Sequence, residues 1–295
     1  MTPIHTIADL RRALEAERRS GRTIGLVPTM GSLHRGHMTL VDRARAACEI
    51  VVVSIFVNPT QFGPGEDLAT YPRDLDADLA ECRAHGVDVV FAPGVEEIYP
   101  EPLATEIDVA PLSTILIGVE RPGHFQGVAT VVAKLFNIVG PTHAFFGEKD
   151  YQQLTVIRRM VRDLSYGIAI TGVPTVREED GLACSSRNQK LVPEDRAAAA
   201  VIAKALGEAE RLIAAGVRDP GAIVAAVERT IAVEARADIR SVDLRDAETL
   251  AMVETIGETP VVVLVTVRFG DVLLIDQRTV AAAPSAKRPA KGETP

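Results

Sequence analysis

The chain has 295 residues, a formal net charge of −8 and a pI near 5.4, with 47% hydrophobic and 24% charged residues. This length suits one large domain or two ordinary ones, and the composition is normal for a globular protein. A surface that binds nucleic acid is normally basic, so the acidic balance argues against RNA or DNA as a substrate, although it leaves room for a local basic patch.

Hydropathy and cysteine usage indicate the cellular compartment in which we expect the chain. No apolar run approaches the roughly 20 residues that a membrane span needs, so we expect no membrane segment. Residues 1–5 lack a signal-peptide pattern. Cys48, Cys82 and Cys184 are scattered without C-x-x-C spacing, which argues against a disulfide framework and against a zinc site. Together these features predict a protein of the reducing cytoplasm.

Short apolar strands alternate with amphipathic helices from the N-terminus to about residue 175. The pattern predicts strands at 23–27, 51–57, 87–91, 144–146 and 168–173, and helices at 7–19, 38–48, 74–85, 125–139 and 151–164. The near-continuous apolar run at 51–57 is typical of a parallel strand that is covered on both faces. This alternation predicts an α/β fold with a doubly wound parallel sheet.

The composition changes after residue 175. Residues 177–187 are polar and rich in turn formers, and the pattern then predicts helices at 193–215 and 219–235, a strand at 241–244, and a hairpin formed by 261–268 and 272–276. Helices followed by antiparallel strands indicate a smaller α+β domain. We therefore predict domains at 1–175 and 176–283. The tail at 284–295 lacks periodicity, and we expect it to be disordered.

The sharpest local signal lies in residues 28–37, which join the first strand to the next helix and contain His34, Gly36 and His37. A helix N-terminus offers free backbone N–H groups and a positive dipole end, so this junction is a ready phosphate site. Imidazoles there can add donors or charge near physiological pH. The alternative is a pair of solvated loop histidines with a turn glycine. A metal pair is disfavoured because no third ligand lies nearby.

A second polar cluster, residues 147–153, follows the strand at 144–146. Ligands of open α/β sheets bind at the carboxyl ends of the strands. Lys149 can place a positive charge on a polyphosphate, and Asp150 can meet a ribose hydroxyl or a metal-bound water. Gln153 lies four residues after Lys149 and shares a helix face with it. The alternative is an ordinary solvated helix start.

A third cluster, residues 183–188, contains Ser185, Ser186 and Arg187. Two hydroxyls and a guanidinium suit the capture of a phosphate chain, although an ordinary interdomain loop has the same composition.

Amides and a cation occur in two further loops. Asn58 and Gln61 directly follow the strand at 51–57, where they can recognise a hydroxy acid, although Asn-Pro also favours a simple turn. Arg121 can pair with a carboxylate or stay a solvated loop charge.

Taken together, these segments resemble the pantothenate synthetase family. The matching segments are 27–31, 34–37, 54–62, 145–153, 172–175 and 185–188. The resemblance implies an enzyme that joins pantoate to β-alanine: the pantoate carboxylate attacks the α-phosphate of ATP, pantoyl adenylate and pyrophosphate form, and the amine of β-alanine displaces AMP. It also implies a Rossmann-like fold of the nucleotidylyltransferase type with a C-terminal lid domain, Mg²⁺ with ATP, and a homodimer.

The resemblance further implies roles for single residues. The expected catalytic residues are His37, as the donor to the transition state, His34 beside it, and Lys149 and Arg187, which would clamp the triphosphate. The expected ATP-binding residues are Met30, Gly31, Ser32, Leu33, His34, Arg35, Gly36, His37, Gly147, Glu148, Lys149, Asp150, Val176, Cys184, Ser185, Ser186 and Arg187. The expected substrate-binding residues are Gln61 and Gln153 for pantoate, with Gln61 also near β-alanine, and Asn58, Tyr71, Arg121 and His124 as further candidates.

One residue departs from the family pattern, and other functions compete with this interpretation. The family commonly has Met or Leu where this chain has Cys184, a small thiol that can fill an apolar role. A nucleotidylyltransferase that transfers AMP to a phosphorylated acceptor shares the His-x-Gly-His device, but residues 58–62 and 145–153 argue against it. A nucleic-acid-binding module related to tRNA synthetases is disfavoured by the acidic charge.

Overall fold

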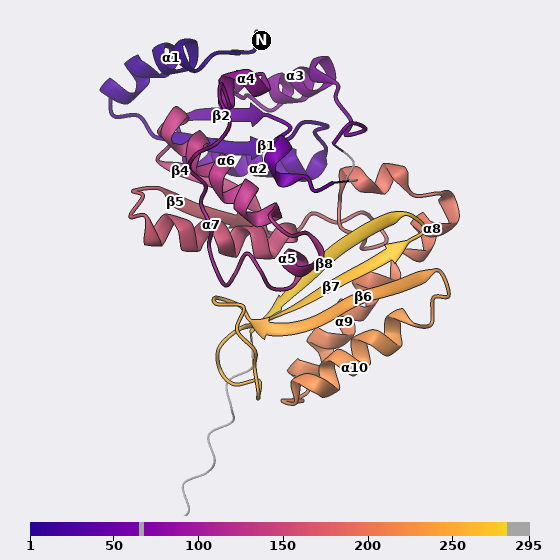
Figure 1. Ribbon diagram of the computed structural model, residues 1–295. Helices are drawn as coiled ribbons and strands as arrows, with labels where there is room; N and C mark the ends of the chain where they lie inside the picture. The colour runs from indigo at the N-terminus through magenta and orange to yellow at the C-terminus, as the bar shows by residue number, and fades with distance from the viewer. Residues whose placement is uncertain (65–67, 282–295) are drawn as a thin grey trace, which may run out of the picture. The chain divides into compact units, whose positions relative to one another are not determined.

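The structure is a computed structural model that describes residues 1–64 and 68–281, so the predicted tail at 284–295 lies outside the described residues. The chain divides into two compact units, Met1–Lys190 and Leu191–Pro295. Figure 1 shows both units, from indigo to yellow along the chain.

A five-stranded parallel sheet of order β3-β2-β1-β4-β5 forms the centre of the first unit (Figure 1). Its strands are β1 (Ile24–Thr29), β2 (Ile50–Ile55), β3 (Val89–Phe91), β4 (His143–Gly147) and β5 (Ala169–Val173). β1 and β2 are almost wholly buried, as expected for parallel strands covered on both faces. The predicted doubly wound sheet is therefore confirmed.

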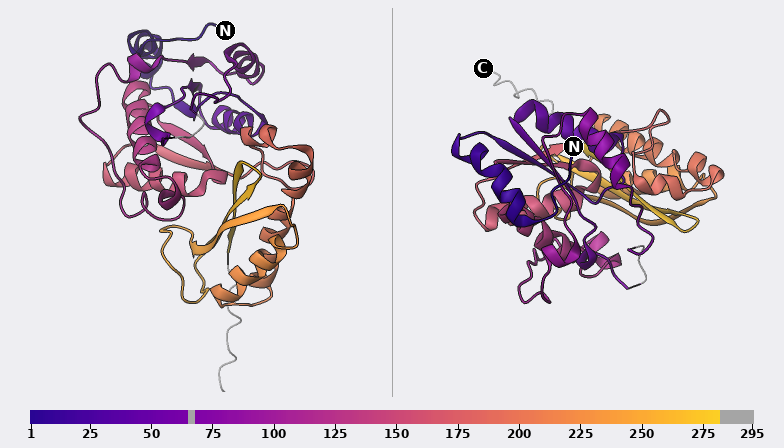
Figure 2. Two further views of the ribbon diagram at one scale, coloured as in Figure 1. Left: turned by 45° about the vertical axis from the view of Figure 1, so that its right-hand side comes forward. Right: turned by 90° about the horizontal axis from the view of Figure 1, so that it is seen from above.

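Helices cover both faces of this sheet, as the views in Figures 1 and 2 show. On one face, α2 (Arg35–Ala47) and α3 (Leu75–Ala84) share a core with alternate strand residues such as Val27, Val51 and Val53. On the other face lie α1 (Ile7–Arg19), α6 (His124–Val139) and α7 (Tyr151–Asp163). Short helical segments fill the connections, namely η1 (Pro59–Gln61), α4 (Val95–Ile98), α5 (Ile117–Glu120), η2 (Glu148–Asp150) and η3 (Ser186–Lys190).

The strand order creates a switch point beside β1. From β1 the chain passes through α2 and α3 to β2 and β3 on one side, and then returns to β4 and β5 on the other. The segments that follow β1 and β4 therefore diverge at neighbouring carboxyl ends, where open α/β sheets form a ligand crevice. Those two segments contain His34 and Lys149.

The helix predicted at 38–48 begins three residues earlier, at Arg35. The cause is that the imidazole of His34 caps the helix N-terminus. His34 has extended backbone angles (φ −139°, ψ 174°), and its Nδ1 accepts a hydrogen bond from the backbone N–H of Gly36 at 3.1 Å. Capping satisfies one of the free N–H groups of the first turn and so extends the helix backwards.

The second unit consists of a three-stranded antiparallel sheet with helices along it (Figure 1). The strands are β6 (Ala237–Asp246), β7 (Val261–Phe269) and β8 (Val272–Val280), and the helices are α8 (Pro193–Ala198), α9 (Val201–Ala214) and α10 (Pro220–Ile231). The predicted hairpin is confirmed, and Gly270 adopts φ +54° in its turn. The single helix predicted at 193–215 is wrong, because Ile202 N–H bonds to the carbonyl of Ala199, three residues back, and breaks the α-helical ladder.

Two further observations concern the limits of the elements. Residues 176–190, assigned to the second domain on composition, group with the first unit. They fold back as a loop in which Cys184 N–H bonds to the carbonyl of Val176 at 2.9 Å, and Arg35 on α2 donates to the carbonyl of Arg177. Among the described residues, none of the helices combines the length and the apolar character that crossing a membrane requires.

Candidate active site

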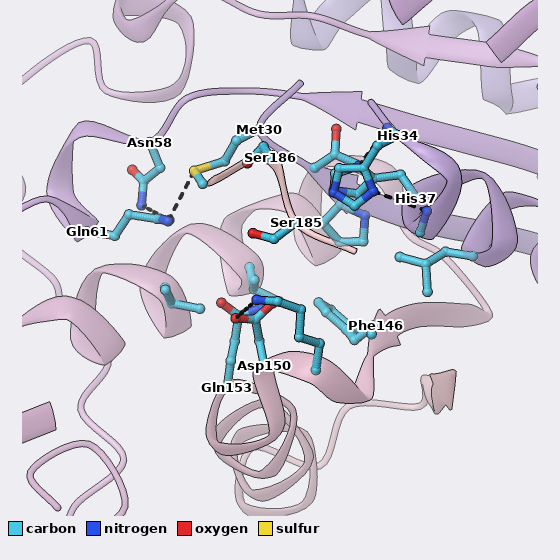
Figure 3. A pocket seen from close by; sticks show the side chains of 18 of the residues that line it. Met30, His34, His37, Asn58, Gln61, Phe146, Asp150, Gln153, Ser185 and Ser186 are labelled. Atoms are coloured by element: carbon cyan, nitrogen blue, oxygen red, sulfur yellow. Dashed lines mark hydrogen bonds and ion pairs between the residues drawn. The ribbon is translucent and has the colours of Figure 1, made fainter. Parts of the chain in front are cut away.

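A pocket lies at the carboxyl ends of β1, β2, β4 and β5, within the first unit. Figure 3 shows His34 and His37 side by side on one wall, with Asp150 and Gln153 pointing into the cavity opposite Ser185. Met30 and Gln61 lie toward one end of the view. The pocket thus gathers groups from every polar cluster that the sequence indicated.

The two histidines are held in defined tautomers. Nδ1 of His34 accepts from Gly36 N–H at 3.1 Å, and Nδ1 of His37 accepts from His34 N–H at 3.3 Å. A backbone N–H can only donate, so in each neutral ring the proton must be on Nε2. The ring centroids are 4.1 Å apart. The first turn of α2 therefore carries two adjacent Nε2–H donors at a helix N-terminus.

The surroundings of both imidazoles lower their pKa values, which favours the neutral forms at physiological pH. Burial and the nearby His34 lower the pKa of His37 from 6.5 to about 3. Burial and the ammonium of Lys149 likewise lower the pKa of His34. Lys149 and Asp150 act on these rings with opposite signs, so the balance of charge in the pocket depends on what binds there.

A buried carboxylate fixes the turn that leads into the histidines. Asp78 on α3 is 3% exposed and accepts hydrogen bonds from Ser32 N–H at 3.0 Å and Leu33 N–H at 2.7 Å. Gly31 has φ +83°, and a Cβ there would lie 2.9 Å from Asp78 Oδ2. A side chain at this position would therefore strain the turn and press on the carboxylate. Asp78 was not among the predicted site residues.

Lys149 and Asp150 form a charged pair at the start of α7. Lys149 Nζ lies 3.8 Å from Asp150 Oδ1, with the lysine side chain 17% exposed and the aspartate side chain 47% exposed. Burial raises the pKa of Asp150, but Lys149 and Arg187 outweigh burial and hold it below its usual range. Asp150 is thus ionised, and it is the one carboxylate among the described residues that line the pocket.

The loop at 176–187 closes one side of the pocket. Arg35 holds it through the Arg177 carbonyl, and Arg35 Nη2 also lies 3.8 Å from Cys184 Sγ. Within the loop, Ser185 Oγ accepts from Arg187 N–H at 3.2 Å. This arrangement turns Ser185, Ser186 and Arg187 to the pocket that contains the two histidines.

Most of the predicted site residues line this pocket: Met30, His34, Gly36, His37, Asn58, Gln61, Tyr71, Arg121, His124, Gly147, Lys149, Asp150, Gln153, Val176, Cys184, Ser185, Ser186 and Arg187. The predicted residues outside the lining are Gly31, Ser32, Leu33, Arg35 and Glu148. Gly31 to Leu33 instead form the turn bound by Asp78, and Arg35 holds the loop at 176–187. The turn at 31–33 and Arg35 therefore support the pocket from outside its lining.

The sequence analysis missed an apolar wall and a hydroxyl. Val128, Val131, Val132 and Leu135 of α6 line the pocket. The helix is apolar on nearly all sides, which could have indicated a second apolar face besides the one on the core. Thr175 also lines the pocket, and its buried Oγ1 has no hydrogen-bond partner within the described residues. A buried hydroxyl of this kind suits a polar ligand atom.

Comparisons with known proteins show the family of the chain. The pantoate–β-alanine ligase family model matches residues 2–279. Pantothenate synthetase from Rhizobium meliloti is 57% identical over 99% of both chains, and that from Agrobacterium fabrum is 55% identical over 98% of this chain and 99% of its own.

Solved structures give the same result. The crystal structure of pantothenate synthetase from Thermus thermophilus has a TM-score of 0.88 and 48% identity, covering 94% of this chain and 99% of its own. The Francisella tularensis pantoate–β-alanine ligase, complexed with β,γ-ATP and β-alanine, has a TM-score of 0.75 and 32% identity, covering 94% and 97%. From its full-length matches and its fold, this chain belongs to the pantoate–β-alanine ligase family.

Proposed function

We propose that this protein catalyses the ATP-dependent condensation of pantoate with β-alanine, giving pantothenate, AMP and pyrophosphate through a pantoyl adenylate. Membership of the ligase family supports the overall reaction. The observation that carries the site assignment is the pair of Nε2–H donors of His34 and His37, which line one pocket together with Lys149 and the amide of Gln61.

In the first step, a pantoate carboxylate oxygen attacks the α-phosphorus of ATP, and the bond to pyrophosphate breaks. Negative charge builds on the equatorial oxygens of the α-phosphate and on the leaving oxygen. His37 and His34 would donate Nε2–H bonds to these oxygens, and Lys149 and Arg187 would hold the phosphate chain. Donors that are already oriented stabilise such charge without reorganising during the reaction.

In the second step, the neutral amine of β-alanine attacks the acyl carbon of the adenylate. The acyl–oxygen bond to AMP breaks, and the amine proton leaves to solvent as the amide forms. Gln61 and Gln153 line the pocket beside the valine wall of α6, so they suit a substrate with hydroxyls, a carboxylate and two methyl groups. Thr175 and Val176 also line the pocket, and they would offer polar and backbone partners to the nucleotide base.

Mg²⁺ fits this pocket as a companion of ATP. The described chain holds no cluster of three or more His, Cys, Asp or Glu side chains arranged for a metal ion. Mg²⁺ at nucleotide sites usually takes one or two carboxylates together with substrate phosphates, and the ionised Asp150 offers one such ligand. When bound, Mg²⁺ would neutralise part of the phosphate charge; Asp150 bonding to the ribose is the alternative.

Several broader expectations belong to the same proposal. Residues 176–188 would close over bound ATP, and the C-terminal α+β domain would act as a lid. The three free cysteines support a reducing, cytoplasmic setting. A homodimer is expected from the family resemblance, and light scattering on the purified chain would measure it directly.

The decisive experiment is ATP–pyrophosphate exchange in the absence of β-alanine. The proposal requires exchange that depends on pantoate, because pantoyl adenylate forms before the amine enters. Exchange without pantoate, or exchange that needs a phosphorylated acceptor, would instead indicate a nucleotidylyltransferase. Salt-sensitive tRNA binding at micromolar protein would favour a nucleic-acid module.

A further inference from the structure

Asn58 lies in the pocket lining, but its side chain is fully occupied by the protein. An asparagine amide has two N–H donors and an oxygen with two lone pairs. Nδ2 of Asn58 donates to Gln61 Oε1 at 3.1 Å and to the backbone carbonyl of Gly127 at 3.2 Å. Its Oδ1 accepts from the hydroxyls of Thr60 at 3.1 Å and Tyr99 at 2.8 Å. All four positions are used, and the residue is 2% exposed.

The carbonyl of Gly127 sets the direction of this network. A carbonyl oxygen can only accept, so the atom of Asn58 that faces it must be the amide nitrogen. Oδ1 must then face Thr60 and Tyr99, and the second N–H must face Gln61. Because that N–H needs an acceptor, Gln61 turns Oε1 toward Asn58 and Nε2 away from it. A backbone atom on α6 thereby fixes the polarity of a side chain in the pocket.

The outward Nε2 of Gln61 has a weak partner. It lies 3.2 Å from the thioether sulfur of Met30, which accepts hydrogen bonds poorly (Figure 3). The main chain of Gln61 is also held, since its carbonyl lies 2.8 Å from His124 Nδ1 and accepts from Arg121 Nη2 at 3.3 Å. The Nε2–H donor of Gln61 is therefore held in place, and it can replace the weak sulfur acceptor of Met30 by a stronger oxygen acceptor of a ligand.

We propose that Asn58 is a positioning residue, oriented by Gly127, Thr60 and Tyr99, which makes Gln61 present an N–H donor to the pantoate carboxylate or hydroxyl. The inference rests on the proposed contact between Gln61 and pantoate. It reassigns Asn58 from substrate contact to support, and it adds Tyr99 and Gly127 to the residues on which pantoate selection depends. Ligands that offer an acceptor at this point are favoured over those that offer a donor.

Close packing explains why position 127 is glycine. A Cβ on Gly127 would lie 2.5 Å from the backbone oxygen of Thr60 and 2.8 Å from the nitrogen of Gln61. Such contacts are with backbone that cannot simply rotate away. The absence of a side chain lets η1 approach α6 closely enough for the Asn58 amide to reach the Gly127 carbonyl.

The variant Y99F tests this proposal, because it removes the hydroxyl that donates to Asn58 and keeps the aromatic ring. The ring contacts of Tyr99 with Phe56 and with the ammonium of Lys134 do not involve the hydroxyl. We expect the KM for pantoate in the exchange assay to rise about three- to tenfold, because this is the effect of losing one neutral hydrogen bond. The KM for ATP should be unchanged. T60V, which removes the other donor, should act in the same direction.

A double-mutant cycle separates positioning from simple structural support. If Tyr99 acts through Gln61, the double variant Y99F/Q61A should bind pantoate as weakly as Q61A alone, with no further loss from Y99F. Where Q61A exchanges too slowly, pantoate binding is measured by calorimetry with a non-hydrolysable ATP analogue. Y166F is the matched control, because the Tyr166 hydroxyl accepts from exposed Asn137 at 3.4 Å. Unfolding midpoints in urea check that each variant folds.

The outcomes are distinct. The positioning role of Asn58 is overturned if the pantoate KM is unchanged in both Y99F and T60V. It is also overturned if the loss of pantoate affinity in Y99F adds to the loss in Q61A. In both cases the contact between Gln61 and pantoate still stands. An unchanged pantoate affinity in Q61A itself overturns the contact and the inference together. If the wild-type protein shows no pantoate-dependent exchange, the proposed function itself is contradicted.

Discussion

Replacing His37 by alanine removes a hydrogen-bond donor, Nε2–H, whose tautomer is fixed by the hydrogen bond from His34 N–H to Nδ1. The pKa of His37 is lowered to about 3, so ATP would have to stabilise the imidazolium by about 6 kcal/mol to keep it charged at pH 7.5. We therefore expect the neutral Nε2–H form of His37 to be the donor in the reaction. Loss of one such oriented donor lowers turnover by about 10²–10³-fold, which we expect for His37→Ala.

The assay is pantoate-dependent ATP–pyrophosphate exchange, followed from pH 6 to 9 with wild type, His37→Ala and His37→Gln. Glutamine keeps a neutral N–H donor, so it should restore part of the turnover that alanine loses. If the imidazolium were required, glutamine would restore nothing, and the wild-type rate would fall about tenfold per pH unit above the pKa of the ring. We expect no such fall attributable to His37 over this range.

Two controls complete the experiment. His143→Ala changes a histidine at the amino end of β4, the end opposite to the pocket, and should leave exchange unaffected. Urea unfolding of His37→Ala should show a loss of about 0.5–2 kcal/mol, because His37 also accepts from His34 N–H in the cap of α2. Near wild-type exchange by a folded His37→Ala would refute the assignment of the ring to the transition state.

Other variants test separate parts of the site. Lys149→Met should lower kcat/KM for ATP about 10- to 100-fold in the exchange assay, since a charge-assisted hydrogen bond to phosphate is lost. Asp78→Asn should lower the free energy of unfolding in urea by about 1–3 kcal/mol, because one oxygen cannot replace the two that accept from Ser32 and Leu33. Because the pKa of His37 is lowered from 6.5 to about 3, the folded protein binds fewer protons than the unfolded chain between these values. Its stability should therefore fall as the pH drops below 6.5, by up to about 5 kcal/mol at pH 3, and His37→Gln should flatten this part of the urea-derived profile.

The sequence was most informative where a pattern is local. The helix predicted at 7–19 has those bounds in the structure, and the alternation of strands and helices predicted the parallel sheet. Polar residues after β1, β2 and β4 could be assigned to one site, because the carboxyl ends of parallel strands meet at one edge. The strand order itself was not predictable from spacing, since it depends on which faces the later helices cover.

Contacts between distant residues account for what was missed. Asp78 binds the turn at 31–33 from 45 residues away along the chain, and Tyr99 reaches Asn58 across 41. Neither spacing carries a local signal. The start of α2 was placed late for a different reason: an imidazole Nδ1 makes the cap, whereas capping rules rest on Ser, Thr, Asp and Asn.

The loop at 176–190 shows how a loop that lines a pocket can resemble a domain boundary in composition. Its polar, turn-rich composition led us to place it in the second domain, yet it groups with the first unit. If this pocket binds a phosphate chain, as we propose, the hydroxyls and the guanidinium of residues 185–187 would take partners from the ligand, which would explain their polar composition. Because Arg35 ties this loop to the helix that begins at the histidines, every described lining residue belongs to one compact unit. We therefore expect the proposed donors for the α-phosphate to belong to the same compact unit as the loop that is proposed to close over the triphosphate.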